Sequence, residues 1–275
     1  MDLVSIVFFL KPQPHPRFNG PIPDWWGHAG HKQLLRVIDY YHPELAKTHY
    51  QEQGLRPFTS STLIGDFPNH QINLKSSYTL RFTACQADIS SILLRAIGTK
   101  GLLAEKTIIE LDYRPFLIEK IATSPLEHPW AETTSYQNLA ANHLIGSNGR
   151  LHKIKLKISS PTAFKSDGKY MLMPIPELVF GSLLDAWNQF SSISFDEDLR
   201  RYIKSALVVS RFDLESKTVP LKQNVARSGC VGSVTYLCLH PDPFLMRQVQ
   251  ALSEYALYSG IGISTSFGLG QVRKY

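Results

Sequence analysis

The chain has 275 residues, 43% of them hydrophobic and 19% charged, which excludes a disordered polymer and is enough for two ordinary domains. The formal net charge of +6 favours an anionic partner, although an excess of this size does not separate RNA from DNA or from an acidic protein. The longest apolar run, Leu3 to Leu10, is too short to span a bilayer and follows no basic segment, so we expect a cytoplasmic protein that does not bind membranes.

The first 122 residues have the pattern of one ferredoxin-like domain. The β-branched and aromatic run from Leu3 to Leu10 predicts a strand that ends at a proline-rich stretch. Apolar residues then recur every three or four positions, which predicts a helix from about His28 to Tyr41 and a short second helix through His49. Farther along, we expect a strand over residues 77–85, a helix over 87–97 and strands over 107–113 and 116–121. This order of strands and helices is that of the ferredoxin-like fold.

The junction between two domains is expected where this periodicity is lost, between about Ala122 and Asn148. Prolines and glycines collect there among polar residues, which is typical of connecting segments. We therefore predict a linker over residues 123–150 and a second domain over residues 151–275.

The second domain begins with a strict alternation of apolar and basic residues from His152 to Ile158. A strand has a period of two, so one face packs while the other carries Lys153, Lys155 and Lys157. A helix over residues 176–190 follows, then strands over 203–212, 218–225 and 230–239, a helix over 243–258 and a closing strand over 268–272. The ferredoxin-like order is thus repeated, which makes the expected fold class α+β with tandem domains of this type.

The three cysteines, Cys85, Cys230 and Cys238, are scattered and lack the close ligand pairs of a zinc site. We therefore expect no disulfide framework, no bound metal and no other cofactor.

A glycine-rich loop between the last helix and the closing strand is the sharpest local feature, with glycines at Gly260, Gly262, Gly268 and Gly270. Backbone amides in such a loop can approach an anionic ligand closely. The loop is not a dinucleotide-binding motif, because its glycines follow a helix instead of opening one. The alternative is a tight connection in which the glycines are needed only for positive φ.

The same region carries a resemblance to a known family. The sequence LSEYALYSGIG from Leu252 to Gly262, followed by TSFGLGQVR from Thr265 to Arg273, resembles the terminal helix and loop of CRISPR-associated repeat-RNA endoribonucleases of the Cas6 family. Two segments agree in the family's order, SPTAF from Ser160 to Phe164 and GCVGSVTY from Gly229 to Tyr236. Upstream, PELAKTH from Pro43 to His49 and RPFTSS from Arg56 to Ser61 are similar to the segment where many members carry a catalytic histidine.

The resemblance implies a member of the RAMP superfamily with two ferredoxin-like domains. The implied reaction is cleavage of CRISPR precursor RNA within its repeats, giving mature guide RNA without a metal. The 2′-hydroxyl attacks the neighbouring phosphate and leaves a 2′,3′-cyclic phosphate and a 5′-hydroxyl. Two fates of the product are compatible with this: it stays bound with other subunits of an interference complex, or it is released between turnovers.

By position in the motif, the resemblance implies His49 as the acid or base of this reaction. His28 and His31 are alternates that share a helix face at i and i+3, and otherwise would be a capping or solvent-exposed pair. Arg56 aligns with a possible cationic partner for the phosphate, the alternative being a solvated loop arginine. Leu35 stands where some members carry a polar catalytic group, so a complete catalytic triad is not expected.

RNA contacts are expected on three surfaces. The lysine face could bind phosphates at the backbone spacing of nucleic acid, or could only protect an edge strand from aggregation. Lys222 and Arg227 flank a hairpin that could reach the RNA or could be a solvated turn. In the glycine-rich loop the expected contacts are Gly260, Gly262, Ser264, Thr265, Gly268 and Gly270, whereas Phe267 is expected to pack inward.

Two other functions compete with this interpretation. A non-catalytic subunit that holds repeat RNA would keep the loop and the basic surface without a productive histidine. A generic RNA-recognition module is disfavoured because the aromatic strand signatures of that class are missing.

Overall fold

The computed structural model describes residues 1–16, 21–51, 54–144, 152–222 and 225–275. Contacts divide the chain into two compact units. The N-terminal unit comprises Met1–Thr133 with the short segments Pro220–Val225 and Ser266–Gly268. The C-terminal unit comprises Thr134–Val219, Ala226–Thr265 and Leu269–Tyr275. No helix in the described part of the chain is long and apolar enough to cross a bilayer.

The N-terminal unit is built on an antiparallel sheet with β1 (Leu3–Pro12) at its centre. Its strand order is β2-β3-β1-β5-β4, and a further short strand, β6, pairs with β1. The other strands are β2 (Phe58–Ser60), β3 (Tyr78–Ala84), β4 (Ile108–Leu111), β5 (Arg114–Ala122) and β6 (Glu132–Thr134). The order β2-β3-β1-β5 is that of a ferredoxin-like domain, with β4 added as the hairpin partner of β5.

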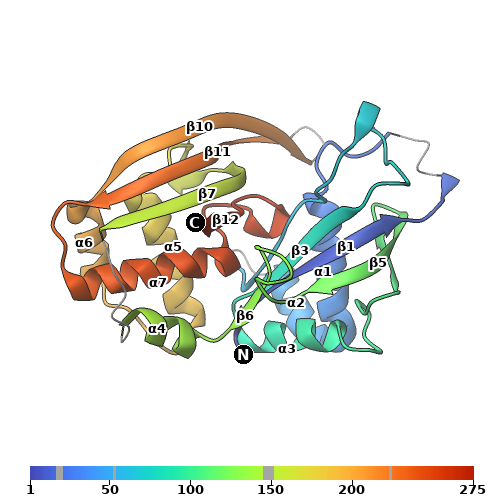
Figure 1. The fold of residues 1–275 in the computed structure, drawn as a ribbon, viewed down its shortest axis with the longest axis horizontal. Coiled ribbons are helices and arrows are strands. Elements are labelled where there is room, and N and C mark those ends of the chain that lie inside the picture. The colour runs from blue at the N-terminus through green and yellow to red at the C-terminus, as the bar shows by residue number, and fades with distance from the viewer. Residues whose placement is uncertain (17–20, 52–53, 145–151, 223–224) are drawn as a thin grey trace. The chain divides into compact units, whose positions relative to one another are not determined.

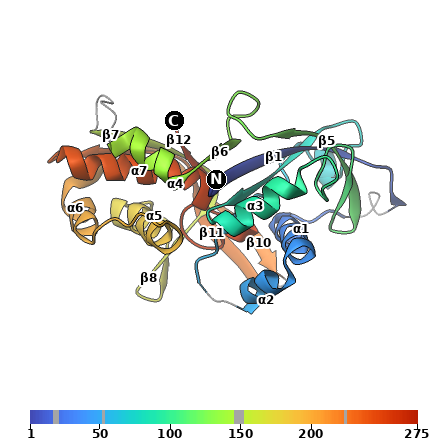
Figure 2. The same ribbon diagram turned by 90° about the horizontal axis from the view of Figure 1, so that it is seen from below.

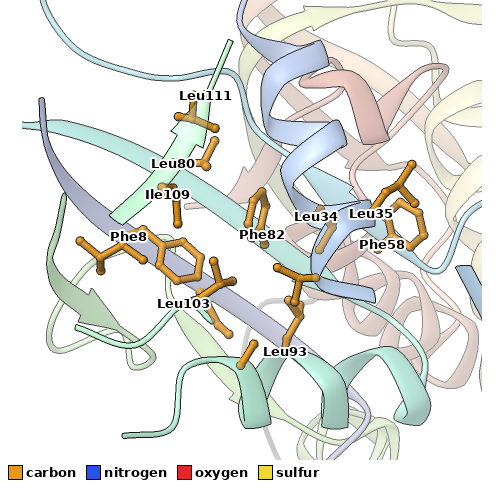
Figure 3. Packing of buried hydrophobic residues seen from close by; sticks show 14 of the residues in the cluster. Phe8, Leu34, Leu35, Phe58, Leu80, Phe82, Leu93, Leu103, Ile109 and Leu111 are labelled. Carbon is orange, nitrogen blue, oxygen red and sulfur yellow. The ribbon is translucent and has the colours of Figure 1, made fainter. Parts of the chain in front are cut away.

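Three helices pack on one face of this sheet (Figure 2). They are α1 (Gly27–Tyr41), α2 (Pro43–Gln51) and α3 (Ala87–Ala96), and a single 3-10 turn, η2, covers Pro68–His70. Alternate residues of β1 point to the helices, so Phe8 meets Phe82 edge to face at 5.4 Å between ring centroids. Figure 3 shows this core, in which Leu34 of α1 and Leu93 of α3 close over the sheet. The predicted elements of the first domain are confirmed to within a few residues.

The C-terminal unit has a four-stranded sheet in the order β10-β11-β7-β12. These strands are β7 (Lys153–Thr162), β10 (Leu207–Lys222), β11 (Val225–Cys238) and β12 (Val272–Lys274), and a separate hairpin pairs β8 (Phe164–Ser166) with β9 (Lys169–Met171). With α5 and α7 as the two crossover helices, this order is again ferredoxin-like. The expected α+β class with tandem domains of this type is therefore confirmed.

Helices of the C-terminal unit pack together against one face of its sheet (Figure 1). They are α4 (Tyr136–Leu144), α5 (Pro176–Phe190), α6 (Asp198–Ala206) and α7 (Pro243–Ser259), followed by the 3-10 turn η3 (Thr265–Phe267). Asp242 caps α7 by accepting from the amides of Phe244 and Leu245, each at 2.9 Å. Trp187 is fully buried and stacks on Phe195 with 4.8 Å between ring centroids.

Two predicted strands of the second half are wrong in their bounds. The strand expected from Ile203 starts only at Leu207, because α6 precedes it and buries Leu199, Ile203 and Ala206 at helical spacing. The strands expected over 203–212 and 218–225 are one long strand, β10, in which Pro220 is tolerated because the strand lies at the sheet edge.

Two connecting segments also differ from expectation. The expected linker over residues 123–150 contains β6 and α4, and the hydroxyl of Tyr136 in α4 bonds to that of Tyr255 in α7 at 3.2 Å. The closing strand begins at Val272 instead of Gly268, because Gly268 and Gly270 adopt positive φ and cannot continue a strand.

Candidate active site

Three histidines and an arginine of the N-terminal unit gather around two phenylalanine rings. We call this group, His28, His31, His49 and Arg56, the histidine cluster. Between ring centroids, His31 lies 4.2 Å from Phe267 and 6.1 Å from Phe58. His28 lies 4.7 Å from Phe267, and His49 lies 5.4 Å from Phe58. The structure thus brings together all four of the catalytic candidates.

His31 is a buried group, 8% exposed, and not the capping or solvent-exposed residue that was the alternative. Burial lowers its pKa to about 4, and the nearby charges of Arg56 and His28 act in the same direction. A hydrogen bond from the ring to the backbone carbonyl of Ser266 opposes them only in part. Its Nδ1 has no hydrogen-bond partner among the described residues. The imidazole is therefore neutral at neutral pH.

His49 lies in the last turn of α2, the short helix predicted to run through it, and is 5% exposed. Its ring meets Phe58 edge to face, with an interplanar angle of 86°. Arg56 donates a hydrogen bond from its guanidinium to the backbone carbonyl of His49, and its guanidinium carbon lies 6.0 Å from the centre of the Phe58 ring. Arg56 is thus half-buried within the cluster, which excludes the solvated loop arginine.

Phe267 packs inward, as expected, and its backbone lies directly on the start of α1. Trp25 Nε1 donates to the Phe267 carbonyl at 2.7 Å. A Cβ atom at Gly27 would lie only 1.7 Å from that carbonyl oxygen, so the first residue of α1 must be glycine. Sequence reasoning missed both Trp25 and Gly27. A glycine opening an otherwise well-patterned helix was the signal that could have found this contact.

The glycine-rich loop is shaped by its own packing. All four glycines have positive φ, and Cβ atoms at Gly262 and Gly270 would come within 2.3 and 2.1 Å of the carbonyl oxygens of Ala163 and Ile261. The amides of Gly260 and Gly270 donate to Ala256 and Pro161 and so are committed inside the protein. Sequence reasoning expected these two amides to face RNA; the hydrogen bonds instead explain the glycines as a tight connection. Gly268 is also buried, whereas three other candidates are half-exposed: Gly262, Ser264 and Thr265.

The predicted lysine face is present on β7. Lys153, Lys155 and Lys157 are exposed and alternate with buried residues. The strand lies between β11 and β12, so the alternative of protecting an edge strand is wrong. Arg273 of β12 stands opposite Lys157, and the Lys155 ammonium lies 5.7 Å from the centre of the Tyr275 ring. Sequence reasoning missed Arg273, which cross-strand pairing adds to this face.

The hairpin candidates Lys222 and Arg227 are not brought together with the lysine face by any described contact. Arg227 packs on the β8–β9 hairpin, with its guanidinium carbon 4.1 Å from the centre of the Tyr170 ring. Lys222 ends β10, and its side chain lies outside the described residues, as do residues 223–224.

Metal-ligating side chains do not cluster in the described part of the chain, where no group of three or more histidine, cysteine, aspartate or glutamate residues could hold an ion. The three cysteines are buried.

Comparisons with known proteins point to one family. The family model described as CRISPR-associated endoribonuclease Cas6 matches residues 156–272. A curated protein of that name from Mycobacterium tuberculosis (strain H37Rv) is 32% identical over 123 residues, 44% of this chain and 38% of that protein. One from Streptococcus thermophilus is 24% identical over 162 residues, 57% of this chain and 65% of that protein. The matched region thus spans 38% of the first relative and 65% of the second.

Solved structures agree in fold over the whole chain. A product complex of the Thermus thermophilus Cas6 protein TTHB231 has a TM-score of 0.81, with 23% identity over 99% of this chain and all of that one. A substrate mimic complex of the Cas6 protein TTHA0078 has a TM-score of 0.71, with 23% identity over the full length of both chains. The family model, the curated relatives and the solved structures to which the chain is similar thus all carry one name, Cas6.

Proposed function

We propose that this protein is a metal-independent endoribonuclease that cleaves CRISPR repeat RNA into guide RNA. The observation that carries the proposal is the histidine cluster, in which a neutral imidazole, a second histidine and an arginine share one site in a chain that is similar to Cas6 proteins. The relatives are named as endoribonucleases, and the similar structures include product and substrate mimic complexes. Repeat RNA and the cleaved guide RNA are the proposed partners.

The reaction needs two proton transfers and stabilisation of charge on phosphorus. The 2′-oxygen forms a bond to the neighbouring phosphorus while the bond from phosphorus to the 5′-oxygen breaks. A base takes the 2′-hydroxyl proton, and an acid gives a proton to the leaving 5′-oxygen. The products are a 2′,3′-cyclic phosphate and a 5′-hydroxyl, and water is not consumed.

His31 suits the base. A histidine with a pKa of about 4 is almost wholly unprotonated at neutral pH, so it can accept a proton but has none to give to a leaving group. A neutral imidazole has one N–H and one lone pair. Since the ring donates to Ser266 and its Nδ1 has no described partner, the lone pair lies on Nδ1. Nδ1 is buried in the free protein, and catalytic contacts commonly form only in the substrate complex.

His49 is the proposed acid, which leaves His28 as the third histidine beside them. Arg56 has a planar guanidinium that can bind two phosphate oxygens and stabilise the transition state. Its bond to the His49 carbonyl keeps this cation beside both histidines. The lysine face, with Arg273 alongside, supplies further phosphate contacts, and the half-exposed residues Gly262, Ser264 and Thr265 are the loop's candidates.

A labelled repeat RNA incubated with the protein in EDTA tests the proposal. Cleavage is expected, with a 2′,3′-cyclic phosphate on the upstream product, whereas an RNA with one 2′-deoxy substitution before the cut site should stay intact. Tight binding of both RNAs without cleavage would instead favour the non-catalytic subunit. A burst of one equivalent of product would show that the guide RNA stays bound, as an interference-complex subunit requires.

A further inference from the structure

A cavity of about 360 Å³ opens on the N-terminal unit beside the histidine cluster. Its floor is one stripe of α1 in which His28, Lys32 and Arg36 follow each other at intervals of four residues. Trp25 lies in the wall that precedes α1, and the turn between β4 and β5 contributes the opposite wall. A cavity of this volume is within the range of small-molecule sites. Only His28 is shared with the histidine cluster.

Gln33 supplies the first sign that this cavity takes a ligand. It lines the cavity, is only 7% exposed, and its Oε1 accepts no hydrogen bond from any described residue. A buried acceptor without a partner costs free energy, so native structures rarely retain one. A ligand that donates a hydrogen bond would satisfy it. The exocyclic amino group of adenine, cytosine or guanine is such a donor.

Tyr113 supplies the second sign. Asp112 and Tyr113 form the two-residue turn between β4 and β5, with φ of 48° and 61°. Such turns favour asparagine, aspartate or glycine, and a bulky tyrosine with positive φ is strained. The side chain is 55% exposed, with the Lys32 ammonium 5.0 Å from the centre of its ring. Strained residues of this kind are enriched at ligand sites.

The wall that carries Tyr113 is held in place by Arg114. This buried arginine donates to the carboxylate of Asp112 and, at 2.6 Å, to the carbonyl of Pro21, which belongs to the segment before α1. The two walls of the cavity are therefore tied together without a ligand, and a preformed site loses less entropy on binding.

The charges of the cavity suit a phosphate together with an amino-bearing base. Lys32 and Arg36 are cations on its floor, and the carboxylate of Asp112 is neutralised by Arg114. Glu110 remains as an acceptor. We propose that this cavity binds one unpaired nucleotide of the RNA, its base against Tyr113 and Gln33 and its phosphate against Lys32 and Arg36. The proposal rests on the proposed function for the identity of the RNA.

Binding of non-cleavable RNA tests this. A repeat RNA that carries the 2′-deoxy substitution is prepared as a series in which each nucleotide in turn is abasic. The wild-type protein should lose roughly 5- to 100-fold in affinity at one position, the usual range for a stacked base. Tyr113→Ala and Gln33→Leu should each bind the intact RNA more weakly and lose much of the penalty at that position. Tyr40→Ala, which changes an exposed tyrosine elsewhere on α1, should retain it in full.

Each outcome of this experiment is decisive. The proposal would be overturned if no abasic substitution weakened RNA binding to the wild-type protein. It would also be overturned if the loss of affinity were the same in Tyr113→Ala and Gln33→Leu as in the wild type. Lys32→Gln is an independent test of the phosphate contact, because this variant should lower the salt dependence of RNA binding without changing the fold. Binding of free adenosine monophosphate that leaves RNA affinity unchanged would indicate an effector site and would also overturn it. Cleavage is measured separately on all-ribose RNA, so a protein that does not cleave but shows the Tyr113-dependent penalty refutes only the proposed function.

Discussion

Arg56 donates a hydrogen bond from its guanidinium to the backbone carbonyl of His49, seven residues earlier in the chain. The same cation faces His31, whose pKa it lowers, second only to burial. One arginine thus fixes the backbone of one histidine and the protonation state of another. Its removal should be visible in the pH dependence of the reaction as well as in its rate.

Arg56→Ala should move the acidic limb of the pH–rate profile to higher pH. In the wild-type protein the limb that reports the base is expected near pH 4, because His31 is unprotonated above that pH. Without the nearby positive charge, protonation of His31 becomes easier and its pKa rises. Single-turnover cleavage between pH 3.5 and 8 measures the limb. Arg56→Lys keeps the charge and should move it less; identical limbs in all three proteins would contradict this coupling.

Protein stability should fall as the pH is lowered from about 6.5 to 4. His31 has a depressed pKa in the folded protein, so the unfolded chain binds a proton in this window and the folded one does not. The contribution of His31 to the free energy of unfolding is fully present above the pKa of a histidine in the unfolded chain. Its loss at lower pH amounts to at most about 3 kcal/mol. Urea denaturation across the window is the measurement. His31→Gln should flatten the dependence relative to wild type, whereas the exposed control His240→Gln should not.

His49→Ala and His31→Ala should each slow cleavage by about 10²- to 10⁴-fold, the usual contribution of a positioned acid or base. RNA affinity, measured with the 2′-deoxy substrate, should change little because neither residue is exposed. His240→Ala serves as the matched surface control. Intact cleavage in His49→Ala would mean that the acid is another residue, with His28 the next to test. Loss of affinity together with cleavage would indicate a structural role.

Replacement of Lys153, Lys155 and Lys157 by glutamine should reduce the salt dependence of RNA binding. Each lost contact to a single-stranded phosphate lowers the slope of log affinity against log salt by about 0.7, so a total change near 2 is expected. The matched control replaces three exposed lysines of the N-terminal unit, Lys75, Lys100 and Lys106. If both triple variants changed the slope equally, the lysine face would have no special role.

Much of the fold could be predicted because most elements have a strong local period. The alternation around Lys155 and the apolar spacing of α1 and α5 gave elements close to those observed. The helix α6 was missed although Leu199, Ile203 and Ala206 have helical spacing, because Ile203 was assigned to the start of the following strand. The boundary between a short helix and a strand that follows it directly is the least certain part of such a prediction.

The candidate site was only partly predictable. His49 and Arg56 came from a motif, and the shared face of His28 and His31 came from helix geometry. The contact of His31 with Phe267 joins residues more than 230 positions apart, and no local pattern encodes it. The cavity could not be predicted for the same reason, because its lining comes from α1 and from a hairpin turn some 80 residues later in the chain. A tyrosine in place of one of the usual turn residues was the one available signal.

Phe267 packs on α1, so the histidine cluster cannot be completed before residue 267 has been synthesised. Ser266–Gly268 belongs to the N-terminal unit although it lies within ten residues of the chain's last residue. During synthesis, the first 133 residues can leave the ribosome long before the segment that packs on His28 and His31 exists. Those two histidines stay without their aromatic neighbour until residue 267 has been synthesised. A nascent or truncated chain that lacks residues 266–268 therefore carries an incomplete histidine cluster.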